Sequence, residues 1–425
     1  MKLGDLLTDL LGTDLPVAFT LYDGTRVGPP DAPAAVVVRS PDALRRMLTA
    51  PGELGFARAY VAGDLDVVGD VFAALALRDR LPEVQLRPRQ WLAILRLLGV
   101  SGMRPLPAPA EEARLHGGRH SQARDAAAVA HHYDISDHFY QAVLGPSMTY
   151  SCAVWHDDTD TLEAAQANKH ELVAAKLGLQ PGMRLLDIGC GWGGMLLHAA
   201  EHHGVTCVGV TLSRPQAELA AKRAAEAGLA GRIEVRYQDY RDIDDGPYDA
   251  IASIGMFEHV GLSQLETYFE RCAALLRPGG RFLNHGISRP ASPDGAASGS
   301  RARFARRGFI ERYVFPDGEL HEVGSVVSAI QRPGIEVRHV ESLREHYALT
   351  LRSWVANLES NWDACVAAAG QARARIWRLY LAASALNFEA NRSQVHHVLG
   401  VKPDGGRSYL PLRPRFHDGA RSHER

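Results

Sequence analysis

A glycine-rich turn between an apolar run and a helical stretch constrains the fold of this chain more than any other feature. Residues 183–194 read MRLLDIGCGWGG, in which Leu185 and Leu186 precede Gly189, Gly191, Gly193 and Gly194. Glycine has no Cβ atom, so the backbone of such a turn can come close to a ligand. The segment therefore predicts a buried strand, a nucleotide- or nucleoside-binding turn and a helix.

Three kinds of glycine loop compete for this segment, besides a plain tight turn. A phosphate loop needs Gly-Lys followed by Ser or Thr, and no lysine follows these glycines. The dinucleotide pattern GxGxxG is matched poorly, because the glycines are spaced as GxGxGG. With Asp187 two residues before the first glycine, the spacing resembles motif I of the S-adenosylmethionine-dependent methyltransferases.

Composition excludes several classes of protein. The 425 residues have a net charge of −2, which does not favour a nucleic-acid partner. Five scattered cysteines form no CxxC pair and no zinc spacing, so we expect reduced thiols in the cytosol and no metal. The N-terminal MKLGDLLTDLLGTDLP lacks the apolar run of a signal peptide, and no stretch of about 18 apolar residues is present. We expect a cytoplasmic protein.

The chain divides into an N-terminal domain (residues 1–100), a linker rich in Pro, Gly, Ala and Arg (101–125) and a C-terminal domain (126–425). In the first, residues 17–22 and 35–38 are expected to be strands. Ser40, Pro41 and Asp42 predict a helix start, with Ser40 as the cap.

The C-terminal domain alternates strands with helices. We expect a helix over 213–227, capped by Ser213 with Pro215 in its first turn, and strands over 184–188, 206–211, 233–237, 250–254 and 281–285. Such alternation predicts an α/β fold with a doubly wound, Rossmann-like parallel sheet. Ligands of such sheets bind beyond the carboxyl ends of the strands.

Polar side chains follow these strands. Thr211, Leu212 and Gln216 follow the second strand and suit a ribose, although Ser213 also serves simply as a helix cap. Gln238 and Asp239 follow the third strand and suit an adenine, or form a solvated turn. Glu258 and His259 follow the fourth, directly after Met256 and Phe257, which argues against a solvated loop. Upstream, Cys152 ends the string MTYSC; a lone cysteine is more often buried than reactive, and spacing shows no base for it.

Seven motifs in order make the resemblance specific: HYDIS, MTYSCAVW, LLDIGCGWGG, VGVTLS, QDYRD, GMFEHVG and HGIS. Together they resemble the cyclopropane-fatty-acyl-phospholipid synthase family, relatives of the mycolic acid cyclopropane synthases. The resemblance runs from about residue 125 to the end and more faintly includes GELGFARAYVAGDLDV. It implies a class I methyltransferase domain preceded by a smaller α+β or helical domain that engages lipid.

The resemblance implies transfer of a methylene group from S-adenosylmethionine to a cis double bond of an unsaturated phospholipid acyl chain, which forms a cyclopropane. The cofactor residues carried over are Tyr150, Ser151, Asp187, Gly189, Gly191, Gly193, Thr211, Leu212, Gln216, Gln238 and Asp239. A bound bicarbonate is implied as base, held by Cys152, Glu258, His285, the backbone of Ile287 and Tyr347. His259 is expected to orient Glu258.

Two other functions stay open. One family branch makes methyl- or methylene-branched chains and reads EMIEAVG where this chain has GMFEHVG. This chain retains Glu258 and differs from that branch by carrying His259 and His285, which favours cyclopropanation. A lipid-binding protein with an inactive fold is disfavoured by the intact set of Cys152, Glu258, His285 and Tyr347. The chain departs from the family at His396 and His397, where relatives tend to carry aromatic residues before a final strand, and in the loop 292–300.

A phospholipid substrate requires contact with a membrane. Residues 86–99, LRPRQWLAILRLLG, combine arginines with Trp91 and leucines and suit an interfacial helix or a helix packed in the core. Rival phosphate contacts are Arg301, Arg303, Arg306 and Arg307. By analogy with the family we expect peripheral association with the inner face of the membrane and a homodimer.

Overall fold

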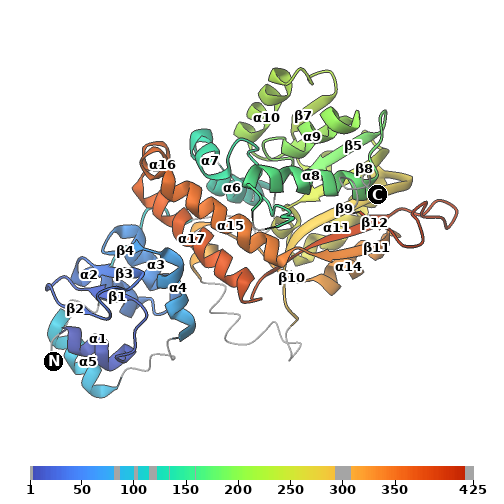
Figure 1. Ribbon diagram of the computed structural model, residues 1–425. Coiled ribbons are helices and arrows are strands. Elements are labelled where there is room, and N and C mark those ends of the chain that lie inside the picture. Colours follow the sequence, from blue (N-terminus) through green and yellow to red (C-terminus); the bar gives the residue numbers. More distant parts are fainter. Residues whose placement is uncertain are drawn as a thin grey trace. The chain divides into compact units, whose positions relative to one another are not determined.

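The chain forms two compact units, each assembled from segments far apart in the sequence (Figure 1). The computed structural model describes residues 3–80, 87–99, 104–113, 122–133, 135–157, 159–291 and 308–416. The first unit comprises the described parts of Met1–Arg114, Ala297–Pro316 and Leu358–Leu386. The second comprises those of Leu115–Ala296, Asp317–Asn357 and Asn387–Arg425. Local sequence patterns did not anticipate that 358–386 group with the first unit, because such long-range contacts leave no local signal.

The first unit holds a four-stranded sheet in the order β2-β1-β3-β4. Its strands are β1 (Ala18–Thr20), β2 (Arg26–Val27), β3 (Ala34–Val38) and β4 (Leu65–Gly69). Its helices are α1 (Leu3–Leu11), α2 (Pro41–Thr49), α3 (Glu53–Ala62), α4 (Val71–Arg80), α5 (Pro88–Leu98), α13 (Phe309–Tyr313) and α16 (Trp362–Ala369). The expected helix start is confirmed, because the Ser40 side chain accepts a hydrogen bond from the Asp42 backbone N–H.

Helix α5 is amphipathic. Ala93 and Ile94 pack with Leu6 in a small apolar cluster. Elsewhere on the helix, the side chains of Trp91, Leu92 and Leu95 are 39%, 49% and 38% exposed. Within the described residues, no helix has both the length and the apolar character needed to cross a membrane.

The second unit is built on one large sheet in the order β11-β12-β9-β8-β5-β6-β7. Its strands are β5 (Arg184–Ile188), β6 (Thr206–Thr211), β7 (Ile233–Tyr237), β8 (Tyr248–Ile254), β9 (Leu276–Arg289), β10 (His321–Glu322), β11 (Glu336–Ser342) and β12 (Gln394–Val401). Strands β7, β6, β5, β8 and β9 are parallel, as the alternation predicted. The chain order reverses at β5 and β8, and a ligand site is expected at such a switch point.

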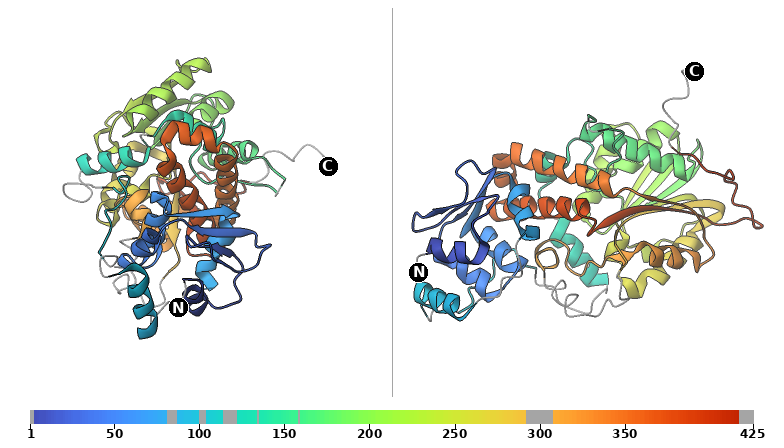
Figure 2. Two further views of the ribbon diagram at one scale, coloured as in Figure 1. Left: turned by 90° about the vertical axis from the view of Figure 1, so that its left-hand side faces the viewer. Right: turned by 60° about the horizontal axis from the view of Figure 1, so that its bottom comes forward.

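Helices cover both faces of this sheet (Figure 1; Figure 2). They are α8 (Leu162–Leu177), α9 (Gly194–His203), α10 (Arg214–Glu226), α11 (Leu265–Leu275) and α14 (Val323–Gln331). The unit also contains α6 (Gln122–Tyr133) and α7 (Asp137–Leu144). The short turns η2 (Tyr240–Asp242), η3 (Phe257–His259) and η4 (Leu262–Gln264) follow strand ends. The long helices α15 (Arg344–Ser360) and α17 (Gln371–Glu389) span residues of both units.

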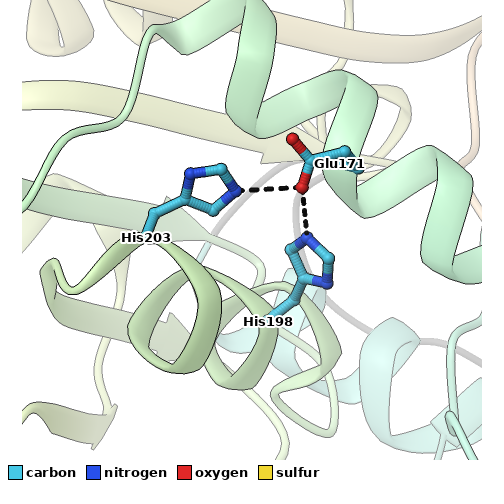
Figure 3. Close-up of side chains that lie close together, drawn as sticks. All are labelled: Glu171, His198 and His203. Atoms are coloured by element: carbon cyan, nitrogen blue, oxygen red, sulfur yellow. Dashed lines mark hydrogen bonds and ion pairs between the residues drawn. The ribbon is translucent and has the colours of Figure 1, made fainter. Parts of the chain in front are cut away.

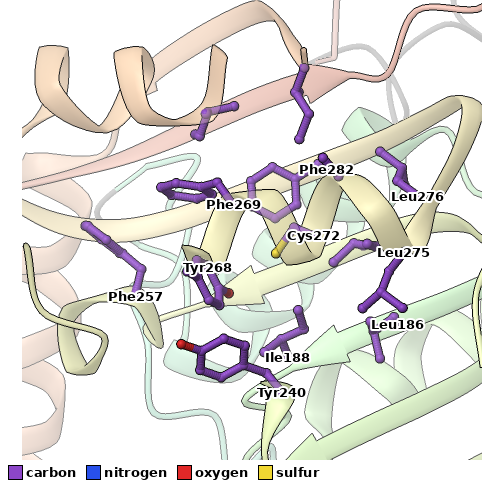
Figure 4. Packing of buried hydrophobic residues seen from close by; sticks show 14 of the residues in the cluster. Leu186, Ile188, Tyr240, Phe257, Tyr268, Phe269, Cys272, Leu275, Leu276 and Phe282 are labelled. Atoms are coloured by element: carbon purple, nitrogen blue, oxygen red, sulfur yellow. The ribbon is translucent and has the colours of Figure 1, made fainter. Parts of the chain in front are cut away.

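Two apolar clusters pack against the sheet because side chains alternate along each strand. On β5, Leu185 belongs to the cluster with α8 and α9. Its neighbours Leu186 and Ile188 belong to the cluster with α11 and α14, which Figure 4 shows. Fully apolar strands buried on both faces are typical of a central parallel sheet.

The antiparallel edge of the sheet was not predicted. Strand β12 pairs antiparallel with both β9 and β11. His396 and His397, expected before a final strand, lie within β12 itself. This correction matters, because the register places His397 directly opposite His285.

Candidate active site

The glycine turn has the backbone conformation that its sequence predicts. Gly189, Gly191 and Gly193 have φ angles of +81°, +53° and +81°, in a region that other residues rarely adopt. A Cβ on Gly191 would meet no atom within 4 Å, whereas a Cβ on Gly193 would lie 3.2 Å from Ala220 of α10. Gly191 therefore leaves open space for a ligand, and Gly193 permits close packing of a helix.

A cavity opens at the carboxyl ends of β5, β6 and β8. Its volume is about 1070 Å³, counting the part open to solvent. Eight predicted cofactor residues line it: Tyr150, Ser151, Asp187, Gly189, Gly191, Thr211, Leu212 and Gln216. The other described lining residues include Asp125, Tyr133, Met148, Lys169, Trp192, Tyr240, Arg241 and Met256. Buried Asp187 fits a bound ligand because its Oδ1 has no hydrogen-bond partner in the described structure.

Three predicted cofactor residues lie outside the lining. Gly193 faces α10, as described above. Asp239 is held by Arg241, whose Nε lies 2.8 Å from its Oδ1, and Gln238 donates a hydrogen bond to the Asp242 carbonyl. Arg241 also pairs with Asp125 at 3.0 Å, so the arginine lines the cavity in place of the predicted carboxylate.

The edge after β6 is fixed by hydrogen bonds. The Thr211 hydroxyl donates to Oε1 of Gln216 at 2.8 Å and accepts from the Ser213 backbone N–H. Ser213 in turn caps α10, since its Oγ accepts from the Gln216 N–H. The interpretation of Ser213 as a helix cap is therefore confirmed, and the cap positions side chains that line the cavity; their contact with a ribose stays a prediction.

Lys169 is the main cavity residue that the sequence analysis missed. It projects from α8, is 1% exposed, and donates a hydrogen bond to Ser151 Oγ at 3.2 Å. Burial lowers its pKa and raises that of Asp187, and the two groups attract each other. Lysine is rarely fully buried, so the residue type gave no reason to expect Lys169 in a cavity. The only indication in the sequence is its helical spacing with Gln166 and Val173, which places it on the buried face of α8.

Glu258 is the first of the residues predicted to hold the base. Its Oε1 accepts a hydrogen bond of 2.7 Å from the Ile287 backbone N–H. Its Oε2 is buried and has no hydrogen-bond partner in the described structure. Burial raises the pKa of Glu258 to about 7, although the bond from Ile287 acts the other way. The carboxyl group of Glu258 therefore changes its protonation state near neutral pH. It also accepts the hydrogen bond of the Ile287 N–H, which was expected to bind bicarbonate.

Cys152 and Tyr347 meet at one backbone carbonyl. The Cys152 thiol lies 3.6 Å from the Leu343 carbonyl oxygen, which also accepts the Tyr347 backbone N–H. Both side chains are buried. Burial raises the pKa of the Cys152 thiol well above its usual range, so it stays protonated and can donate a hydrogen bond. The structure therefore favours a binding role for this cysteine over a nucleophilic one.

His285 lies fully within the sheet, on β9. Its Nδ1 is 2.8 Å from Nε2 of His397 on β12. Burial holds the pKa of both imidazoles well below the usual value. The backbone of His259 belongs to η3, but its side chain lies outside the described residues, so its expected role stays a prediction.

The predicted base-holding residues are buried behind the cavity lining. None of Cys152, Glu258, His285, Ile287 and Tyr347 is among the described residues that line it. The link is Lys169, which lines the cavity and interacts electrostatically with both Cys152 and His285. Taken one by one, a protonated thiol, neutral imidazoles and a carboxylate oxygen without a partner in the described structure suit the binding of an anion, as the family resemblance implies.

Comparisons with known proteins agree with this geometry. The model of a family described as mycolic acid cyclopropane synthetase matches residues 120–398. The chain is 45% identical over 411 residues to a Mycobacterium tuberculosis protein named "Probable fatty acid methyltransferase Rv3720", with 94% of each chain covered. It is 34% identical over 370 residues to the cyclopropane-fatty-acyl-phospholipid synthase of Escherichia coli K12, covering 87% of this chain and 88% of that one.

A solved structure is similar to the second unit. It is the mycolic acid cyclopropane synthase CmaA1 complexed with SAH and CTAB, with a TM-score of 0.61 and 35% identity. The match covers 65% of this chain and 98% of that chain. The class I methyltransferase fold expected from the motifs is confirmed.

Proposed function

Because the chain belongs to the mycolic acid cyclopropane synthetase family of S-adenosylmethionine-dependent methyltransferases, we propose that it forms cyclopropane rings on unsaturated phospholipid acyl chains. One observation supports this most strongly. Glu258 presents a buried carboxylate oxygen without a partner, directly after the strand whose end lines the cofactor cavity. A group of this kind serves a reaction that must release a proton away from water.

The proposed reaction has two bond-forming stages. The π electrons of a cis double bond attack the sulfonium methyl, so a C–C bond forms and the S–C bond breaks. The neighbouring alkene carbon is left as a cation. A proton then leaves the new methyl group while that carbon closes onto the cation, which yields the ring and S-adenosylhomocysteine. The site must exclude water, because water would trap the cation.

The residues present fit a bound bicarbonate, which would supply the base for this proton. Cys152 and His285 can donate hydrogen bonds to an anion, whereas the Ile287 N–H is already bonded to Glu258. Lys169, whose pKa burial lowers to about 7, carries a partial positive charge near Cys152 and His285 at neutral pH. The Oε2 atom of Glu258, which has no hydrogen-bond partner in the described structure, can accept a hydrogen bond from the hydroxyl of bicarbonate and so orient the bicarbonate. The chain's own groups thus hold, orient and electrostatically favour the base.

Helix α5 supports the proposed lipid contact. Arg89 and Arg96 flank the exposed side chains Trp91, Leu92 and Leu95, a combination that suits the surface of an anionic bilayer. The helix packs in the core through Ala93 and Ile94, and its exposed side is the one we propose for contact with lipid. The arginines at 301–307 lie outside the described residues. The homodimer and the inner membrane face stay predictions.

A second candidate function is addition of a methyl or methylene branch to an acyl chain. It is favoured by the name of the M. tuberculosis relative, a probable fatty acid methyltransferase, which matches 94% of this chain. The chemistry shares the first stage. For a methylene branch, a hydride must then shift from the methylated carbon to the cation before the new methyl group loses its proton, and a saturated methyl branch needs a further reduction. His259 and His285, which the branching enzymes lack at these positions, favour ring closure.

Incubation of the full chain with S-adenosylmethionine and vesicles of cis-unsaturated phospholipid tests the proposed class of reaction. We expect each turnover to release S-adenosylhomocysteine and to add one CH2 to an acyl chain, measured by mass spectrometry of the lipids. Vesicles of saturated phospholipid are the control and should gain nothing. Binding of S-adenosylmethionine without any modified lipid would instead support an inactive, lipid-binding protein.

A further inference from the structure

A row of hydrogen-bonded polar side chains leads from the site to the surface of the second unit. The strand register places His285 opposite His397, and His397 opposite Glu341, on β9, β12 and β11. Directly opposed residues of neighbouring strands project from the same face of a sheet. Lys176, at the end of α8, lies on this face and bonds to both His397 and Glu341.

The contacts of this row are continuous. His285 Nδ1 lies 2.8 Å from His397 Nε2, and His397 Nδ1 lies 2.9 Å from the Lys176 ammonium. Lys176 also forms an ion pair with Glu341. The Lys176 side chain is 0% exposed and that of Glu341 is 21% exposed, so Glu341 connects the row with solvent.

The charge on Lys176 fixes the imidazole tautomers. A protonated lysine donates to His397 Nδ1, so the proton of neutral His397 must sit on Nε2. That N–H then donates to His285 Nδ1, and the His285 proton must sit on Nε2. In this state His285 offers an N–H donor to the site, which suits an anion there.

We propose that His397, Lys176 and Glu341 form a proton path that carries the proton of the methyl-transfer reaction from His285 to solvent. This inference rests on the proposed function, because it assigns an exit to the proton that ring closure or branching releases. No residue of the row except His285 belongs to the predicted site. His397 and its neighbour His396 were singled out in the sequence only as departures from the family.

The transfer starts from the other state of the row, in which Lys176 has lost its proton to water through Glu341 and each imidazole carries its proton on Nδ1; it ends in the state described above, with Lys176 as the ammonium. A proton arrives at His285 Nε2, the His285 Nδ1 proton moves to His397 Nε2, and the His397 Nδ1 proton moves to Lys176. The resulting ammonium lies beside the Glu341 carboxylate and can lose its proton to water. No imidazole holds a net charge at the end of the transfer.

The surroundings support both states of the path. Burial lowers the pKa of Lys176, while Glu341 raises it. Burial, with the positive charges of Lys176 and Lys169, keeps His285 and His397 neutral. The other titratable group acting on His397 is His339 of β11, and Arg281 of β9 donates only to the Lys176 backbone carbonyl. Burial and the neighbouring charges thus keep both imidazoles of the row, His285 and His397, uncharged.

The matched substitutions His397→Gln and His396→Gln test the path. The amide introduced by His397→Gln can keep both hydrogen bonds, donating to His285 and accepting from Lys176, but does not relay protons readily. His396 is adjacent on β12 and bonds Ser288 instead, so its substitution is the control. We expect His397→Gln to lower kcat at least about tenfold, to increase its solvent deuterium isotope effect, and to leave the S-adenosylmethionine Kd within about twofold. A kcat within about twofold of wild type would overturn the path.

A second readout needs neither lipid nor turnover. In ¹⁵N-histidine-labelled wild-type chain near neutral pH, His397 should show a protonated Nε2 and a bare Nδ1. A doubly protonated His397, or a proton on Nδ1 while Lys176 is charged, would overturn the row as drawn. If the wild-type chain shows these tautomers but makes no modified lipid, the proposed function is wrong. The hydrogen-bonded row is then confirmed, but its role in carrying the proton of the reaction is not.

A separate cluster on the same unit points to a metal ion. Glu171 of α8 lies between His198 and His203 of α9, and both imidazoles point at one carboxylate oxygen (Figure 3). Nε2 of His198 and of His203 lie 3.1 Å and 3.0 Å from Glu171 Oε2. Ligand atoms of a tetrahedral zinc ion lie about 3.3 Å apart, given metal–ligand bonds of about 2.0–2.1 Å.

We propose that these three side chains bind a first-row divalent ion such as Zn²⁺, with water completing the shell. Burial lowers the pKa of His198, and hydrogen bonds from the histidines lower that of Glu171 against the effect of burial. Both shifts favour the neutral imidazole of His198 and the ionised carboxylate of Glu171, the forms that bind a metal. The sequence analysis expected no metal because it considered cysteine spacings, whereas these ligands come from two helices.

Calorimetry of the full chain without a polyhistidine tag, titrated with zinc alone, tests this site. We expect one ion per chain, an increase in Tm, and at least about a hundredfold loss of affinity in His198→Ala and His203→Ala. His138→Ala, which removes an exposed histidine of α7, is the matched control and should bind as wild type does. Equal affinity in all three variants, or no uptake by wild type at micromolar zinc, would overturn the site.

Discussion

At the scale of single residues, Glu258 is central to the proposed proton chemistry, because it follows the strand whose end lines the cofactor cavity. Its motif GMFEHVG predicted a group at a strand end, and the structure places it there with one oxygen bonded to Ile287 and the other unpaired. The burial of this carboxyl group has two expected consequences: Glu258 contributes to kcat, and its charged form lowers the free energy of unfolding. They are separable by experiment.

We expect Glu258→Gln to lower kcat by at least about a hundredfold while the S-adenosylmethionine Kd changes less than about twofold. The reason is that Glu258 lies outside the cavity lining and acts only on the base. Turnover of lipid and equilibrium binding of S-adenosylmethionine are the two measurements. A loss of cofactor affinity as large as the loss of kcat would show that Glu258 belongs to the cofactor site.

The same substitution should change stability in a pH-dependent way. Burial raises the pKa of Glu258 from 4.5 to about 7, so between these values the folded chain holds a proton that the unfolded chain has released. Its contribution to stability therefore falls as pH rises through this window. Above it, Glu258→Gln should raise the free energy of unfolding by up to about 3 kcal/mol, and near pH 4 it should change little. Urea unfolding at both pH values measures this, and equal effects at both would contradict the buried charge.

Single residues also show where sequence reasoning ended. Strand-end motifs identified Asp187, Thr211 and Gln216 in the cavity lining, because the chemistry of a turn is local. Lys169 was missed, since a lysine on a helix is ordinarily a solvent-exposed residue. Asp239 was placed in the lining, but Arg241 binds it, and the partner of a carboxylate cannot be read from its own motif.

At the scale of elements, the strands of the parallel sheet were the most predictable part of the fold. The expected ranges 184–188, 206–211 and 233–237 agree with β5, β6 and β7. Apolar runs bounded by glycine and polar residues define these strands locally. Strands β11 and β12 are exceptions because their burial comes from neighbours distant in the chain, and polar residues interrupt their apolar patterns.

The glycine turn gives a test at this scale. Gly191→Ala and Gly182→Ala each place a Cβ at a positive φ with no atom within 4 Å, but only Gly191 lines the cavity. We expect each to cost about 1–2 kcal/mol of stability through backbone strain. Only Gly191→Ala should also weaken S-adenosylmethionine binding, by at least about tenfold in calorimetry. Equal cofactor affinity of the two variants would contradict the cradle.

Helix α5 gives a second test. Replacing Trp91, Leu92 and Leu95 together by Ser should lower binding of the full chain to anionic phospholipid vesicles by at least about tenfold in sedimentation assays. Leu262→Ser removes a leucine that is 63% exposed in the second unit and serves as the control. A triple variant that binds vesicles as well as the control does would contradict the interfacial role of α5.

At the scale of the whole molecule, the second unit gathers groups that the sequence keeps far apart. Cys152, Glu258, His285 and Tyr347 come from a loop, a turn, a strand and a helix, and their shared role in holding a base is expected only through the family resemblance. The proton row adds Lys176, Glu341 and His397 from three further elements. Its assembly depends on the register of β9, β12 and β11, which no local pattern specifies.

The most direct test of the central claim follows the transferred carbon. The full chain is incubated with S-adenosylmethionine carrying a ¹³C-labelled methyl group and with cis-unsaturated phospholipid vesicles, and the lipid product is examined by NMR. We predict that the label appears as the CH2 of a cyclopropane ring, with its protons at characteristically high field. A label found in a branching CH3 or an exocyclic methylene, with no ring protons, would contradict cyclopropane formation.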